Sequence, residues 1–169
     1  MIVGDSAGGN LTVSLVAKLR DAGRDLPKAI ICMSPWLDLT AQGDSYRYNY
    51  ELDPIFGKKR KSKYYVDLEE MYLLGLYPDK HDLKDPYLSP IFGEFHNFPP
   101  MLIQVGTHEV LESDSIMAYQ KAKEANVDVT FTRYKGMFHV FQLTHHLIPE
   151  GKKAWKEIED FIMRQLYLK

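Results

Sequence analysis

The chain has 169 residues, of which 45% are hydrophobic and 26% charged, and its formal net charge at pH 7 is −2. This composition is typical of a globular domain and excludes collagen-like, disordered and low-complexity chains. The balance of 21 basic and 23 acidic residues gives no general attraction to nucleic acid or an anionic membrane. A single cysteine, Cys32, excludes an intrachain disulfide and favours a reducing compartment, so we expect a cytoplasmic protein. No apolar run is long enough to predict a transmembrane span.

Strand and helix patterns alternate along most of the chain. In chain order we expect a strand remnant at 2–3, a helix at 8–21, strands at 29–33 and 101–105, a helix at 113–125, a strand at 128–134 and a helix at 151–166. The runs at 29–33 and 101–105 are continuously apolar, as in buried parallel strands. The pattern predicts an α/β fold with a mostly parallel sheet flanked by helices.

Residues 41–97 interrupt this alternation, because tyrosine, proline and charged residues dominate them. A helix is expected near 62–74. Acidic residues follow the basic run at 58–61 directly, so we interpret that run as a solvated face and not as a nucleic-acid site. The whole segment is predicted to be an insertion lying over the strand ends, where α/β sheets bind ligands.

The segment Gly4-Asp5-Ser6-Ala7-Gly8 matches G-x-S-x-G between a strand and a helix, the context of a nucleophile elbow. The flanking glycines are expected to remove side chains that would collide in this turn, which pushes the Ser6 hydroxyl above the sheet. The N–H of Ala7, at the positive end of the helix dipole, would point to a developing oxyanion. The alternative is a glycine-rich turn with an incidental serine, which the flanking strand and helix disfavour.

A serine hydroxyl needs a base, which in this chain order follows the acid. His139 lies on a glycine-containing loop just beyond the strand at 128–134, whereas the later His145 and His146 resemble surface residues. The acid is expected after the strand at 101–105, and Glu109 is nearest its end, where it would orient the imidazole. Asp114 is the alternative acid, although its place near a helix start favours a capping role.

Four blocks extend this interpretation, namely 4–11, Ser34-Pro35-Trp36-Leu37-Asp38, Asp85-Pro86-Tyr87-Leu88-Ser89-Pro90 and Gly136-Met137-Phe138-His139. Together they resemble the hormone-sensitive-lipase-like esterases of the α/β-hydrolase fold across nearly the whole chain. The resemblance implies hydrolysis of short or medium acyl esters through an acyl-enzyme, with Ser6 as nucleophile and His139 as base, and with no metal or organic cofactor. The acid of that family is usually an Asp; here its position carries Glu109.

Trp36, Phe138 and Phe141 are candidates for lining a substrate pocket, and a plain core role is the alternative for Trp36. Two other functions remain open at this stage. One is a serine peptidase on the same fold, because the same triad serves both reactions. The other is a non-catalytic module that binds small molecules, which the presence of both Ser6 and His139 disfavours.

The family resembled here has a longer N-terminal half, with the first strands and a His-Gly-Gly-Gly-type loop that supplies further oxyanion N–H groups. We therefore interpret residues 1–169 as the C-terminal part of a single α/β-hydrolase domain whose N-terminal strands are missing. The isolated chain is expected to be a weak or inactive esterase. Its exposed edge at Ile2 and Val3 is expected to associate with a second copy or with an N-terminal half.

Overall fold

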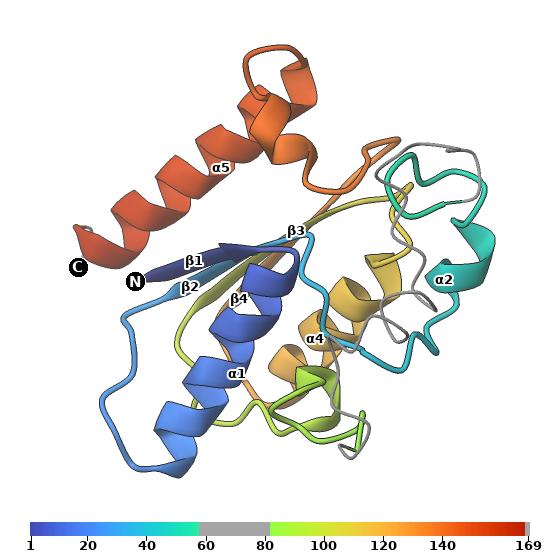
Figure 1. Ribbon diagram of the computed structural model, residues 1–169. Helices are drawn as coiled ribbons and strands as arrows, with labels where there is room; N and C mark the ends of the chain where they lie inside the picture. Colours follow the sequence, from blue (N-terminus) through green and yellow to red (C-terminus); the bar gives the residue numbers. More distant parts are fainter. Residues whose placement is uncertain (58–81, 168–169) are drawn as a thin grey trace.

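The computed structural model describes residues 1–57 and 82–167. Its centre is a four-stranded parallel sheet in the order β1 (Ile2–Asp5), β2 (Ile30–Met33), β3 (Met101–Gly106) and β4 (Val129–Tyr134). The helices α1 (Ala7–Asp21) and α4 (Glu112–Glu124) cover one face, and α5 (Pro149–Leu166) covers the other (Figure 1). The predicted α/β class is confirmed, and each strand and long helix expected in this part lies within two residues of its predicted bounds.

The central strand β2 shows how the two faces of the core are built. Ile30 and Cys32 belong to the apolar cluster under α1 and α4, whereas Ile31 and Met33 belong to the cluster under α5. Successive side chains of a strand point to opposite faces, so a strand covered on both sides must be apolar at every position. This explains why the run at 29–33 is continuous and not alternating.

The parallel arrangement brings four loops to one edge of the sheet, since all four strands end there. Ser6 follows β1 and Ser34 follows β2. The loop after β3 carries Glu109, and the loop after β4 carries His139. The topology therefore places residues that are far apart in the sequence at the same edge of the sheet.

Three short elements complete the described chain: α2 (Ser45–Tyr48), η1 (Pro90–Phe92) and η2 (Phe141–Thr144). The helix expected near 62–74 and the basic run at 58–61 lie outside the described residues. Within the described ranges, none of the helices combines the length and apolar character that crossing a membrane requires.

The expectation about the elbow glycines is correct for Gly4 and wrong for Gly8. A Cβ on Gly4 would lie 2.2 Å from the Gly8 carbonyl oxygen and 2.6 Å from Thr12 Oγ1, whereas a Cβ on Gly8 would meet no described atom within 4 Å. The second crowded position is Gly9, where a Cβ would lie 2.6 Å from the Pro35 Cβ. The close approach of α1 to the neighbouring loop, and not the turn alone, therefore requires the glycine.

We predict that Gly4→Ala destabilises the fold and that Gly8→Ala does not. The added methyl group at Gly4 must displace backbone, which typically costs about 1–3 kcal/mol of unfolding free energy. At Gly8 the change is expected to stay within about 1 kcal/mol, in the stabilising direction, because alanine favours a helix over glycine. Urea denaturation of both variants measures the difference, and equal midpoints would contradict the crowding described at the elbow.

Candidate active site

The elbow serine has a strained backbone that is held from three sides. Ser6 precedes the first residue of α1 and has φ 52° and ψ −121°. Its N–H donates to the Met33 carbonyl at 3.0 Å, and its carbonyl accepts the N–H groups of Gly9 and Trp36 at 3.0 and 3.1 Å. A non-glycine residue with positive φ persists only where its surroundings impose it. These contacts involve only the backbone of Ser6, so its hydroxyl remains available to contact a side chain at the ends of the strands.

The structure brings Ser6, His139 and Glu109 together in one hydrogen-bonded chain. Ser6 Oγ lies 2.9 Å from His139 Nε2, and His139 Nδ1 lies 3.0 Å from Glu109 Oε2. His139 is 8% exposed and Glu109 is completely buried. The ring of Phe56 covers the imidazole, with the two ring centroids 4.7 Å apart. The order of these contacts is the one that the sequence predicts for a nucleophile, a base and an orienting acid.

Burial governs the electrostatics of the acid. It raises the pKa of the Glu109 carboxyl, and the His139 hydrogen bond and charge, the Gly106 N–H and the Ser34 hydroxyl offset only part of that rise. The N–H of Gly106 donates to Oε1 at 2.5 Å, which leaves Oε2 for the imidazole. The Glu109 carboxyl is thus bound by protein donors on one oxygen and by the imidazole on the other.

A second set of contacts fixes the backbone around the acid. The Asn49 side-chain amide donates to the Glu109 carbonyl at 2.7 Å. The Asp53 carboxylate accepts the N–H of Val110 at 2.9 Å with one oxygen and the N–H groups of its own turn with the other. Our sequence analysis missed Asn49 and Asp53. Each is a short polar residue within a segment rich in aromatic residues. That pattern does not predict a hydrogen-bond partner on a distant loop.

Asp114, the alternative acid, has a different role. It is completely buried, and one of its oxygens accepts the N–H groups of Leu37 and Asp38 at 2.8 and 2.9 Å and the Tyr46 hydroxyl at 3.1 Å. Burial raises its pKa to about 8. The predicted capping role is wrong, because α4 has no side-chain cap. Asp114 instead fixes the loop after β2, and the carboxylate bonded to His139 is that of Glu109.

An apolar cavity of about 330 Å³ lies beside the elbow, lined by Ala7, Asn10, Leu11, Ser14, Trp36, Leu39, Tyr87 and Leu88. Of the three predicted pocket residues, Trp36 lines this cavity and Phe138 is half-buried. Phe141 is completely buried, with its ring centroid 4.9 Å from that of Tyr134. The pocket role predicted for Phe141 is therefore wrong, because packing uses its whole side chain.

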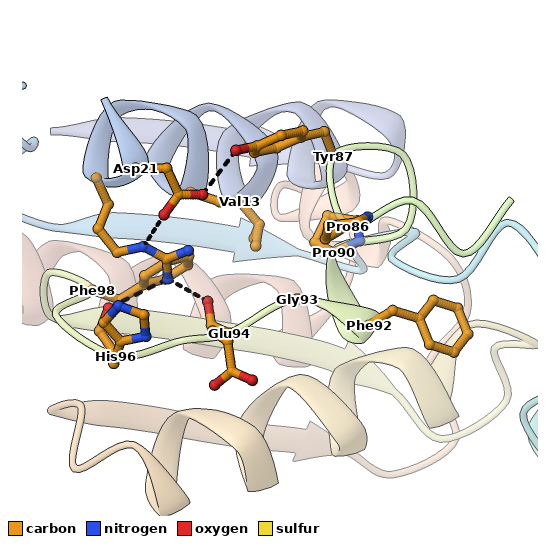
Figure 2. A pocket seen from close by; sticks show the side chains of 12 residues that line it. Val13, Asp21, Pro86, Tyr87, Pro90, Phe92, Gly93, Glu94, His96 and Phe98 are labelled. Atoms are coloured by element: carbon orange, nitrogen blue, oxygen red, sulfur yellow. Dashed lines mark hydrogen bonds and ion pairs between the residues drawn. The ribbon is translucent and has the colours of Figure 1, made fainter. Parts of the chain in front are cut away.

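Figure 2 shows a different cavity, of about 320 Å³, between α1 and residues 86–98. Its polar side chains bind one another: Arg20 pairs with Asp21 at 2.7 Å, and the Tyr87 hydroxyl donates to Asp21 at 2.8 Å. Arg20 also donates to the Glu94 carbonyl. Ser6, His139 and Glu109 do not line this cavity.

Within residues 1–57 and 82–167, no three His, Cys, Asp or Glu side chains are arranged to hold a metal ion.

Comparison with known proteins relates this geometry to enzymes. A family model described as "alpha/beta hydrolase fold" matches residues 1–143. An acetyl-hydrolase from Streptomyces hygroscopicus is 38% identical over 153 residues, and an esterase from Acinetobacter venetianus is 34% identical over 161 residues. These alignments cover 90% and 95% of this chain but 48% and 50% of the relatives. The chain thus spans about half the length of the curated relatives it matches.

Solved structures of esterases are also similar to this chain. A crystal structure of an esterase from the bacterial hormone-sensitive lipase family matches with a TM-score of 0.85 at 36% identity, covering 97% of this chain and 52% of the other. A structure of EstE5 soaked with p-nitrophenyl butyrate matches with a TM-score of 0.82 at 37% identity, covering 96% of this chain and 52% of the other.

The two buried carboxylates are expected to respond differently to substitution. Asp114→Ala leaves two buried backbone N–H groups without an acceptor, at about 1–3 kcal/mol of unfolding free energy each. Glu109→Gln keeps the shape and one carbonyl oxygen, so we predict a much smaller loss of stability. Urea denaturation of both variants tests this, and a Glu109→Gln variant as unstable as Asp114→Ala would contradict the division of roles.

Proposed function

This chain belongs to the hormone-sensitive lipase family of esterases with the α/β-hydrolase fold, and on that premise we propose that it hydrolyses carboxylic esters with short or medium acyl chains through an acyl-enzyme on Ser6. The observation that carries the proposal is the continuous hydrogen-bonded chain from Ser6 through His139 to Glu109. The acetyl-hydrolase and esterase relatives support the substrate class.

The proposed mechanism follows from the orientation of the three groups. Ser6 Oγ attacks the ester carbonyl carbon while His139 Nε2 takes its proton. Glu109 accepts the Nδ1–H hydrogen bond, which fixes the ring and stabilises the imidazolium. His139 then gives the proton to the leaving alcohol. Water repeats the sequence on the acyl-enzyme and releases the acid.

The oxyanion of the tetrahedral intermediate is assigned to the N–H of Ala7. Ala7 is the first residue of α1, so its N–H lies at the positive end of the helix dipole. Because the chain spans half the length of its relatives, we propose that further donors belong to an N-terminal half of the same fold. Loss of one such donor slows the acyl transfer about 10²–10³-fold. Both half-reactions pass through an oxyanion, so the isolated chain is expected to form and to hydrolyse the acyl-enzyme slowly.

The cavity beside Ala7 is the proposed site of the acyl chain. Its lining is mainly aliphatic and aromatic, with Asn10 and Ser14 as polar groups, a composition typical of small-molecule sites. Soaking of the related EstE5 with p-nitrophenyl butyrate supports this class of ester as a probe. A serine peptidase remains the second candidate on the same triad, but the esterase relatives favour the ester.

We predict that a fluorophosphonate probe labels Ser6 in the wild-type chain and not in Ser6→Ala. The probe reacts with an activated serine and needs no deacylation, so it reports the triad even when turnover is slow. Intact-mass analysis gives the stoichiometry, and hydrolysis of p-nitrophenyl acetate gives the turnover. A folded wild-type chain that does not label, or equal labelling of Ser6→Ala, would refute the proposal.

A second prediction concerns the acyl site. Leu11 lines the cavity and is 69% exposed; Leu15, one helical turn later, is 40% exposed and does not line it. Leu11→Trp should fill the space and lower the ratio of kcat/KM for p-nitrophenyl butyrate over acetate about tenfold, since two methylenes lose their contacts. Leu15→Trp is the matched control and should leave the ratio unchanged. Equal effects of the two substitutions would place the acyl chain elsewhere.

A further inference from the structure

Positive φ angles are concentrated around the triad. Among the described residues, six non-glycine positions have positive φ: Ser6, Ser34, Ala41, Asn97, Asn126 and Val140. Three of the six lie in or next to the triad. Ser6 is its nucleophile, Val140 follows His139, and Ser34 contacts the loop that carries the base and the loop that carries the acid. Backbone strain of this kind clusters at functional sites, where the surrounding structure holds it. The mechanism above gives Ser34 no role.

The hydroxyl of Ser34 joins the acid to the base. Ser34 is completely buried, and its Oγ–H donates to Glu109 Oε1 at 2.8 Å. The same oxygen accepts the N–H of Val140 at 3.1 Å. The backbone N–H of Ser34 donates to the Gln104 carbonyl at 2.7 Å, which anchors the residue to the end of β3. One atom therefore touches both the carboxylate and the backbone directly after the imidazole.

We propose that Ser34 is a positioning residue of the triad, which keeps Glu109 charged and fixes the distance between the acid loop and His139; this inference rests on the proposed function. A hydrogen bond donated to a buried carboxylate favours its charged form. Ser34 donates to Oε1, so Oε2 remains directed at Nδ1 of His139. The donation from Val140 N–H to Ser34 polarises the hydroxyl and strengthens the bond that the hydroxyl gives to Glu109.

The contacts that remain without the hydroxyl make the role testable. The Gly106 N–H still donates to Glu109 Oε1, and Asn49 still holds the Glu109 carbonyl. Loss of the Ser34 hydroxyl should therefore weaken the acid's charge and aim without removing its loop. Ser89 offers a matched control, because it is also completely buried and its hydroxyl accepts a single backbone N–H, that of Leu39, at 2.8 Å.

The experiment compares Ser34→Ala with Ser89→Ala in the full chain. Fluorophosphonate labelling of Ser6 and p-nitrophenyl acetate hydrolysis are measured as functions of pH. We expect Ser34→Ala to lower the labelling rate constant and kcat about tenfold or more, with KM unchanged, because a hydrogen bond to a charged group is lost. Since that loss raises the pKa of Glu109 further, the acid limb of the pH profile should move to higher pH. Ser89→Ala should change neither the rate nor the profile.

A second variant guards against misfolding. Ser34→Gly adopts positive φ without a Cβ and also lacks the hydroxyl, so it should show the same loss of rate and the same displacement of the pH profile. Full activity of Ser34→Gly, or equal slowing of Ser34→Ala and Ser89→Ala with an unmoved profile, would overturn the positioning role while leaving the proposed function intact. A folded wild-type chain that does not label would overturn both.

Discussion

The hydrogen bond between His139 and Glu109 is made where the carboxylate has no access to water, and much of the surrounding structure follows from that constraint. Burial disfavours the charged acid, so the fold must supply donors in place of solvent. Gly106 and Ser34 bind one carboxylate oxygen, and the imidazole binds the other. A buried carboxylate with this many partners is fixed in direction as well as in charge, which is what a base needs from its orienting group.

The parallel sheet brings the groups of this arrangement to one edge. Each loop at the carboxyl edge contributes one part of the proposed site: the nucleophile after β1, the bridging hydroxyl of Ser34 after β2, the acid after β3 and the base after β4. The strand ends are tied to each other by backbone bonds, from Ser6 to Met33 and from Ser34 to Gln104. Because β1 and β4 lie three strands apart, the loop after β4 must also extend back over the ends of β3 and β2 to place His139 2.9 Å from Ser6.

Local sequence patterns predicted the helices and strands and the chain order of the site residues. They could not predict contacts between residues that are far apart in the sequence. Ser6 could be found because a five-residue motif sits between a strand and a helix, and His139 because chain order restricts the base. The Ser34–Glu109 bond joins residues 75 positions apart, and no periodicity announces it. The same limit explains two errors. Asp114 lies near the start of a helix, where a capping residue is expected, but its carboxylate binds the loop after β2. Phe141 follows the same loop as His139, as an aromatic residue lining a pocket would, but its side chain is buried in the core.

In the proposed mechanism, nucleophile activation and transition-state stabilisation are carried out by different groups. The hydroxyl, the imidazole and the carboxylate all lie within a chain that spans about half the length of its relatives, on the ends of four adjacent strands. Proton transfer needs only those neighbours, because each step passes between atoms about 3 Å apart. Oxyanion stabilisation needs donors that converge on one point from several directions, and the proposal assigns to the described residues only the N–H of Ala7. Because a single labelling event can be detected however slow it is, a serine that reacts with a phosphonate while ester turnover stays slow would fit the proposed division of the two tasks.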